Sequence, residues 1–124
     1  MTVNYDWNSM TPRERDALVA EKVMGWTDVK YASDIDWFMG IEPEQTDYGI
    51  SFIGEYTTDI SEAWAVLNKL KERVEYVRTT ITDSRRGIKV CVQTIGYSYR
   101  AESVSLAEAI CLAALRACGV EIPV

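Results

Sequence analysis

The stretch YTTDISEAWAVLNKLK, residues 56–71, decides the fold, because it is the clearest helix pattern in the chain. Asp59, followed three residues later by Glu62, predicts a capping box, in which two side chains accept hydrogen bonds from backbone N–H groups at the helix start. Apolar residues then recur at helical spacing. The stripe expected to face the core comprises Ile60, Ala63, Trp64, Leu67 and Leu70. The pattern predicts a helix over residues 59–72 that needs a sheet or a second helix to cover it.

An earlier helix is predicted over residues 11–25. Thr11 with Glu14 forms a second capping box, Pro12 suits the first helical position, and Gly25 suits a left-handed end. The residues expected in the core are Ala17, Leu18, Ala20, Val23 and Met24. Those expected to face water are Arg13, Arg15, Asp16, Glu21 and Lys22. Residues 1–10 show no period, and we expect an irregular arm whose Trp7 packs on the core.

A third helix is predicted over residues 105–118, from Ser105 with Glu108 at its start to Gly119 at its end. This segment is apolar on nearly every side. Such a helix is either enclosed by its own chain or partly exposed to a partner subunit. We therefore expect a homo-oligomer, a dimer or higher, that packs through helix 105–118.

Strand signals fill the region between the second and third helices. Residues 74–82, 88–95 and 97–102 are rich in strand-forming side chains, with a turn at 83–87, and predict antiparallel strands over 74–102. Residues 26–55 are predicted to be a long, irregular, acidic and aromatic segment, with short strands at 29–31 and 49–53.

These elements predict one domain over residues 1–124. The fold class is α+β, a three-layer sandwich of helices and a small antiparallel sheet. Its order is helix, irregular segment with short strands, helix, three strands, helix.

Composition favours a cytoplasmic protein. The chain has 124 residues and a formal charge of −6, and no apolar run approaches the ~20 residues that a membrane helix needs. Residues 1–7 lack the basic and apolar regions of a signal peptide. The three cysteines, at 91, 111 and 118, lie in apolar segments, which indicates reduced thiols in element interiors.

The charge is unevenly distributed. Residues 26–62 carry about −8 and residues 69–100 about +5. Such an asymmetry affects steering and self-association. The net charge of −6 makes direct binding of nucleic acid unfavourable for the chain as a whole, although the basic segment keeps it possible.

Three segments resemble the motifs of the phage ABA sandwich domain family, small proteins encoded in bacteriophage and prophage genomes. They are residues 14–26 (ERDALVAEKVMGW), 56–64 (YTTDISEAW) and 107–115 (AEAICLAAL), in the family's order. The departure lies in residues 27–55, where the family's usual Pro-rich linker is replaced by the acidic, aromatic segment. The resemblance implies a three-layer arrangement in a phage protein that works in the cytoplasm of the infected bacterial host. It supplies no catalytic residue.

The residue inventory narrows the possible chemistry. The chain has no His, which removes the commonest general base and transition-metal ligand, and its cysteines have no Cys-x-x-Cys spacing. No phosphate-binding glycine motif is present. We predict no catalytic residue, no cofactor and no metal. The acidic residues Asp34, Asp36, Glu42 and Glu44 have the oxygen ligands of a hard-cation site, although solvated loop carboxylates are commoner.

A ligand site is predicted on the strands. Guanidinium groups bind phosphate oxygens and phenol rings stack on bases, so basic residues interleaved with tyrosines suit an anionic ligand with a ring system. The residues concerned are Arg78, Lys89, Tyr97, Tyr99 and Arg100. Trp37 and Phe38 in the irregular segment are further candidates, as a recognition patch. The plain alternatives are a half-exposed sheet with alternate polar residues, and a loop that folds back on the core.

Three functions remain open. The first is a non-enzymatic phage accessory protein that binds and sequesters a nucleotide-type signal of host defence. The second is an acidic module that inhibits a host protein through Asp34, Asp36, Glu42 and Glu44. The third is a metal-dependent hydrolase that uses Asp34 and Asp36.

Overall fold

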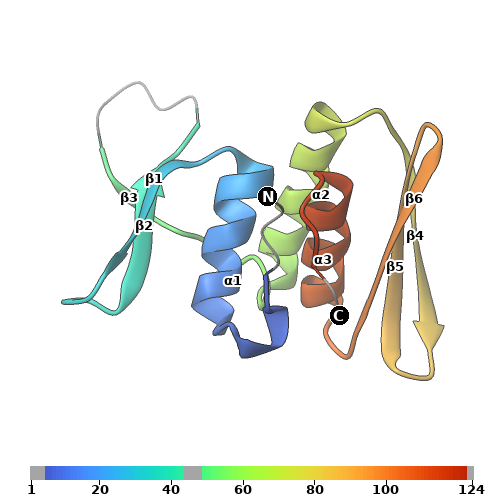
Figure 1. Cartoon of the computed structure of the whole chain (residues 1–124), viewed down its shortest axis with the longest axis horizontal. Helices are drawn as coiled ribbons and strands as arrows, with labels where there is room; N and C mark the ends of the chain where they lie inside the picture. Colours follow the sequence, from blue (N-terminus) through green and yellow to red (C-terminus); the bar gives the residue numbers. More distant parts are fainter. Residues whose placement is uncertain (1–4, 44–48, 123–124) are drawn as a thin grey trace.

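Two small antiparallel sheets flank a central layer of helices (Figure 1). This is a computed structural model of the whole chain, and it describes residues 5–43 and 49–122. One sheet contains β1 (Thr27–Ala32), β2 (Trp37–Ile41) and β3 (Ser51–Phe52). The other contains β4 (Tyr76–Ser84), β5 (Gly87–Thr94) and β6 (Tyr97–Ser103). The predicted α+β class and sandwich architecture are confirmed, with two sheets in place of one.

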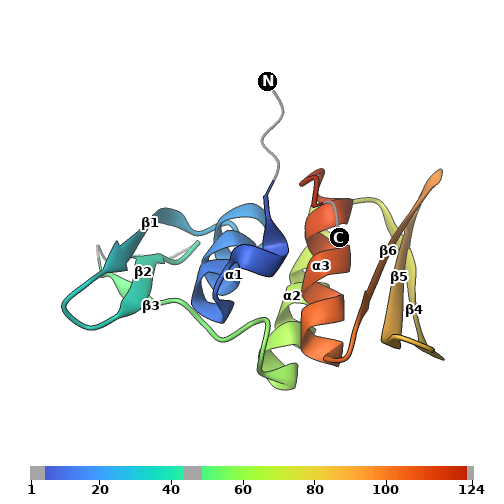
Figure 2. The same ribbon diagram turned by 60° about the horizontal axis from the view of Figure 1, so that its bottom comes forward.

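The helices α1 (Pro12–Val19), α2 (Ile60–Arg73) and α3 (Leu106–Ala117) form the middle layer. In the turned view, α2 and α3 again lie side by side, with the sheet of β4, β5 and β6 against α3 (Figure 2). Val90, Val92 and Ala101 are buried on the face of this sheet that meets the helices. The core therefore lies between the three helices and one sheet face.

The start of α1 is as predicted. The Glu14 N–H donates to Thr11 Oγ1 at 3.2 Å, and the Thr11 N–H donates to Glu14 Oε1 at 2.9 Å. The helix continues as one turn of π-helix, Ala20–Met24, and ends at Gly25, which is left-handed with φ 83°. Asp16 was expected to face water, but this expectation is wrong because only 4% of the residue is exposed.

The stripe of α2 differs from the prediction. Ile60 and Trp64 are both 42% exposed, whereas Val66, Leu67 and Leu70 are buried with Ala63. The helix packs against α3 and the Ala20–Met24 turn, so the face that they cover is rotated toward Val66. Helical periodicity defines an apolar stripe, but the partners decide which edge of a wide stripe is covered.

Two of the predicted capping boxes form only in part. The Ser61 N–H donates to Asp59 Oδ1 at 2.9 Å, but the Glu62 carboxylate accepts from the Glu55 N–H in the preceding turn. Ser105 Oγ accepts from the Glu108 N–H at 3.3 Å, but the Glu108 carboxylate turns away to Trp7, Arg15 and Ser103. Each glutamate thus fixes a tertiary contact in place of a local cap.

Residues 26–55 were predicted to be irregular with short strands, and their described part contains more strand than expected. β1 pairs with β2, and β2 with β3, all antiparallel. Two strands lie where short strands were expected, whereas β2, which carries Trp37 and Phe38, was not predicted. Residues of β2 on both faces are half-buried, and Gly40 is buried. The strand therefore lacks the alternation of apolar and polar residues by which strands are predicted. A Cβ on Gly40 would lie 3.1 Å from the Thr27 carbonyl oxygen, which explains why this position suits glycine.

The second sheet follows the prediction closely. β4 and β5 form a hairpin in which Ser84 pairs with Gly87, so the turn is shorter than the predicted 83–87. Gly87 has φ 123°, and a Cβ there would lie 2.5 Å from the Ser103 carbonyl oxygen. β6 returns beside β5 after Gly96.

Helix α3 is covered by its own chain. Every residue from Ala109 to Leu115 is buried, as are Ala107 and Ala117. Of the two alternatives for this apolar helix, the structure shows enclosure, and it leaves little apolar surface on α3 for a second subunit.

Candidate functional site

The outward face of the β4–β5–β6 sheet carries the predicted basic residues. Paired residues share a face in an antiparallel sheet, and Thr80, Cys91 and Arg100 pair across the three strands. Their face is opposite to that of Val90, Val92 and Ala101, which meets the helices. This outward face carries three cations, Arg78, Lys89 and Arg100, and we call it the basic sheet face. Each strand supplies one of them, and none of the described helices or strands covers this face (Figure 1).

The polar neighbours on this face can add hydrogen bonds. Arg78 Nε donates to Gln93 Oε1 at 3.0 Å, which holds its guanidinium over β5. Thr80, Thr82 and Ser98 share the face by register. Glu102, which pairs with Lys89, is an acid on the same face. The arrangement is a flat polar surface with excess positive charge, suited to an anion.

The tyrosines lie on the other side of β6. Tyr97 and Tyr99 alternate with Arg100 and therefore point to the helix-facing side, with their ring centroids 6.3 Å apart. The structure brings the three cations together but separates them from the two phenols by the thickness of the strand. A ligand that contacts both sets has to pass around the free edge of β6.

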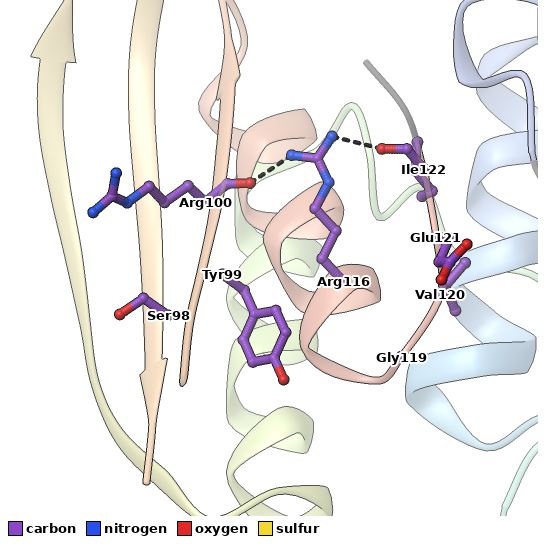
Figure 3. Close-up of a pocket in the computed structure, with 8 residues that line it drawn as sticks. All are labelled: Ser98, Tyr99, Arg100, Arg116, Gly119, Val120, Glu121 and Ile122. Carbon is purple, nitrogen blue, oxygen red and sulfur yellow. Dashed lines mark hydrogen bonds between the residues drawn. The ribbon is translucent and has the colours of Figure 1, made fainter. Parts of the chain in front are cut away.

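A groove lies along that free edge, between β6 and the segment after α3 (Figure 3). Its volume is about 600 Å³, and its lining includes Tyr99, Arg116 and residues 119–122. Arg116 donates to the carbonyl oxygens of Arg100 and Ile122, the latter at 2.8 Å. Burial lowers the pKa of its guanidinium. In Figure 3 the Arg100 side chain points away from this groove, so only its backbone contributes.

Sequence reasoning missed Arg116. The sequence pattern does not mark it as a site residue, because a basic residue in the last turn of a helix is favoured by the helix dipole in any case. The structure gives it a second role, because it ties the edge of β6 to the segment that follows α3.

Trp37 and Phe38 lie in the other sheet, on the far side of the helices from the basic sheet face (Figure 1). They line two adjoining cavities, of about 430 and 350 Å³, between the start of α1 and the β1–β2 hairpin. We call these cavities the hairpin groove. Both are lined by Thr11, Arg13 and Asp36. The seven predicted site residues thus lie in three separate places: the basic sheet face, the helix-facing side of β6 and the hairpin groove.

The walls of the hairpin groove are held by specific contacts. Arg13 lies over the Trp37 ring at 3.6 Å from its centroid, and Trp37 Nε1 donates to the Ile53 carbonyl oxygen at 3.0 Å. The Tyr31 and Phe38 ring centroids are 5.2 Å apart, and the Tyr31 hydroxyl donates to Asp36. That hydrogen bond is the main reason why the pKa of Tyr31 is raised.

A buried carboxylate closes the base of the same region. Asp16 Oδ1 accepts from the Thr57 N–H at 2.8 Å and from its hydroxyl at 2.7 Å. Burial raises the pKa of Asp16, and the two hydrogen bonds from Thr57 offset this in part. The Asp16 carboxylate is engaged with Thr57 and joins α1 to the segment before α2.

Burial raises the pKa of the Cys118 thiol, and the positive charge of Arg73 offsets this in part. Burial raises the pKa of the Cys111 thiol well above its usual value, and Cys111 donates to the Tyr56 carbonyl oxygen at 3.2 Å. Cys91 and Cys118 are only half-buried. Cys91 lies within β5, on the same sheet face as Arg100, and Cys118 lies at the end of α3.

Within residues 5–43 and 49–122, no group of three or more Asp, Glu or Cys side chains is placed to hold a metal ion. Asp34 and Asp36 lie in the turn between β1 and β2, and Glu44 lies outside the described residues. In the same part of the chain, no helix is long and apolar enough to cross a membrane.

Comparisons with known proteins agree with the fold. A model of the phage ABA sandwich domain matches residues 17–115. The crystal structure of a phage protein from Bacillus cereus ATCC 14579 is similar to this chain, with 27% identity and a TM-score of 0.69. The match covers 96% of this chain and 97% of that one. No curated protein matches.

Proposed function

This chain belongs to the phage ABA sandwich domain family, and from that premise we propose that it is a non-enzymatic phage accessory protein that sequesters a small, anionic, nucleotide-type signal of host defence. Its place of action in this proposal is the cytoplasm of the infected bacterium. The supporting observation is the basic sheet face, where Arg78, Lys89 and Arg100 share one uncovered surface. Guanidinium groups bind phosphate oxygens in a bidentate manner, which suits this ligand class.

The proposal assigns separate roles to the other predicted residues. Arg78, Lys89 and Arg100 bind the phosphates, and Tyr97 and Tyr99 are reached only by a ligand that extends around the edge of β6. An oligomer remains part of the proposal. Because α3 is enclosed by its own chain, the contact between subunits needs another surface than the apolar side chains of that helix.

Native mass spectrometry tests this proposal directly. The protein is purified from bacteria in which antiphage signalling has been triggered, and the spectrum reports both the oligomeric state and any retained small molecule. We expect a nucleotide-sized adduct on the wild type. The adduct should be lost from a variant that combines Arg78→Ala, Lys89→Ala and Arg100→Ala, since these changes remove the cations without touching the core.

A charge-matched control removes three cations elsewhere: Lys22→Ala, Lys30→Ala and Lys69→Ala. Each of these lysines forms an ion pair with a neighbouring acid on other surfaces, at 3.6, 3.7 and 3.1 Å. This control should keep the adduct. Absence of an adduct on the wild type, when the signal is shown to accumulate, would contradict the proposal. So would an adduct that survives the triple change on the basic sheet face.

The second candidate, an acidic module that inhibits a host protein, is favoured by the position of Asp34 and Asp36. Both lie in the exposed turn of the β1–β2 hairpin, on the far side of the molecule from the basic sheet face. Charge reversal at Asp34 and Asp36 should abolish capture of a host protein but spare small-ligand binding.

A further inference from the structure

The hairpin groove combines aromatic walls with an excess of acidic side chains. Trp37 is held by its hydrogen bond to the Ile53 carbonyl oxygen, so its ring has a fixed place in the wall. Tyr31 and Phe38 line the adjoining cavity, and Asp36, which accepts from the Tyr31 hydroxyl, lines both cavities. Such walls bind flat cations, because the face of an aromatic ring attracts positive charge.

The charges around the groove point to a cationic occupant. Glu14, Asp16, Asp36 and Glu55 line its two cavities, against one cation, Arg13. Asp16 is buried and engaged with Thr57, whereas Glu14, Asp36 and Glu55 are exposed to solvent. Charge complementarity therefore excludes an acidic peptide as the favoured partner.

Arg13 shows which cation the groove accepts. Its guanidinium carbon is 3.6 Å from the centroid of the Trp37 ring, which is close contact for a stacked guanidinium. Arg13 lies in the first turn of α1, is exposed to solvent, and forms no ion pair within the described residues. The stack on Trp37 holds the Arg13 guanidinium against the groove wall.

We propose that the hairpin groove binds an arginine side chain of a partner protein, and that Arg13 occupies the position of this side chain in the free protein. The incoming guanidinium stacks on Trp37 and donates to the carboxylate of Asp36, while Arg13 moves into solvent. Arginine is favoured over lysine because only a planar guanidinium both stacks on an indole and forks onto a carboxylate. The inference names the partner chemistry for the protein-interaction candidate, rests on that candidate, and is independent of the basic sheet face.

Replacement of Arg13 by the incoming guanidinium can be told apart from a purely structural role of the Arg13–Trp37 stack. If Arg13 competes with the ligand, Arg13→Ala strengthens binding, because the ligand no longer displaces a resident cation. A stack of this kind at an exposed site contributes about 0.5–1 kcal/mol, so the gain in affinity is about two- to fivefold. If Arg13 were instead part of the binding surface, the same change would weaken binding.

The test measures fluorescence polarisation of a labelled peptide, Gly-Arg-Gly-Arg-Gly, against the full chain. Matched peptides carry lysine or citrulline in place of arginine, since citrulline keeps the shape and removes the charge. We expect binding of the arginine peptide, weaker binding of the lysine peptide and none of the citrulline peptide. Equal binding of the arginine and citrulline peptides would overturn the proposal, as would spermidine competing as well as the arginine peptide.

Three variants locate the binding. Arg13→Ala should bind the arginine peptide about two- to fivefold more tightly, and Trp37→Leu and Asp36→Asn should bind it at least about threefold more weakly. Asp36 has φ 50°, a conformation that Asn also adopts, so Asp36→Asn tests the contact even where Trp37→Leu disturbs the fold. Tighter or unchanged binding by Asp36→Asn, or weaker binding by Arg13→Ala, would overturn the proposal.

Two controls separate this proposal from the others. Trp64→Ala removes an exposed indole on α2, outside the groove, and should leave peptide binding unchanged. The variant that lacks Arg78, Lys89 and Arg100 should also bind the peptide as the wild type does. Loss of peptide binding in that variant would place the peptide site on the β4–β5–β6 sheet and refute the inference, whatever the result for the nucleotide-type ligand.

Discussion

The indole of Trp7 donates from Nε1 to Glu108 Oε1 at 2.7 Å, across 101 residues of sequence. Trp7 is 1% exposed, so this hydrogen bond satisfies a buried donor. The same carboxylate accepts from Arg15 at 3.3 Å and from the Ser103 hydroxyl at 2.7 Å. One side chain in the first turn of α3 thus joins the segment before α1, α1 itself and the end of β6.

Glu108→Ala should destabilise the protein by about 2–4 kcal/mol. The change leaves the Trp7 indole N–H buried without an acceptor and removes the ion pair with Arg15, and an unsatisfied buried donor alone costs about 1–3 kcal/mol. Urea unfolding followed by circular dichroism measures the loss. Glu108→Gln is the matched control, because it keeps an acceptor for Trp7, and it should lose about half as much. Equal stability of Glu108→Ala and the wild type would contradict this role.

Asp16→Asn should make the protein more stable at neutral pH and change the pH dependence of its stability. The folded pKa of Asp16 is raised, chiefly by burial, above the 3.8 of an ordinary Asp. The stabilising contribution of such a group is fully present below its unfolded pKa and is lost as pH rises through the folded pKa. Asn carries no charge and still accepts from Thr57. The difference in free energy of unfolding, variant minus wild type, should therefore grow as pH rises from about 4 to 7.

Asp16→Ala separates the charge from the hydrogen bonds. It removes the buried charge and also the acceptor for the Thr57 N–H and hydroxyl, so we expect a loss of about 1–3 kcal/mol at pH 7. Asp16→Asn is also tested at two pH values. If it lowers the free energy of unfolding by the same amount at pH 7 and at pH 4, the buried charge of Asp16 does not determine the effect of this residue on stability.

Trp64 and Trp26 should respond differently to truncation. Trp26 is buried, whereas Trp64 is 42% exposed although it belongs to the α2 stripe that was expected to face the core. Trp26→Ala should cost about 3–5 kcal/mol by leaving a cavity, whereas Trp64→Ala should cost about 1 kcal/mol or less. Thermal unfolding gives both values. A cost above about 2 kcal/mol for Trp64→Ala would show that this indole is covered in solution, for example by a second subunit.

Gly87→Ala should destabilise the protein more than Gly96→Ala. Both glycines have positive φ, 123° and 90°, so each substitution strains the backbone. Only at Gly87 would the new Cβ also meet backbone, 2.5 Å from the Ser103 carbonyl oxygen, whereas nothing lies within 4 Å at Gly96. We expect about 1 kcal/mol for Gly96→Ala and at least about twice that for Gly87→Ala. Chemical denaturation of both variants checks the order, and equal losses would contradict the steric argument.

The candidate sites were harder to predict than the elements. The sequence placed Arg78, Lys89 and Arg100 on strands, and the register then put them on one face. It also grouped them with Tyr97 and Tyr99, although alternation along β6 puts those rings on the opposite side. Arg116 and Arg13 gave no sequence signal of a site, because their roles depend on carbonyl groups and a ring contributed by distant segments.

The sequence by itself determined the three helices and the strands of the β4–β5–β6 sheet. Their signals are local: a capping residue, a glycine with positive φ and an apolar period act within a few residues of the chain. Only the tertiary structure decided that β2 forms, that Asp16 is buried and that Trp64 is exposed. These outcomes depend on which surfaces meet, because burial is set by the neighbour that covers a side chain and not by the side chain itself. Glu62 and Glu108 show the same limit, since both lie at capping positions and bind partners outside their own helix turn.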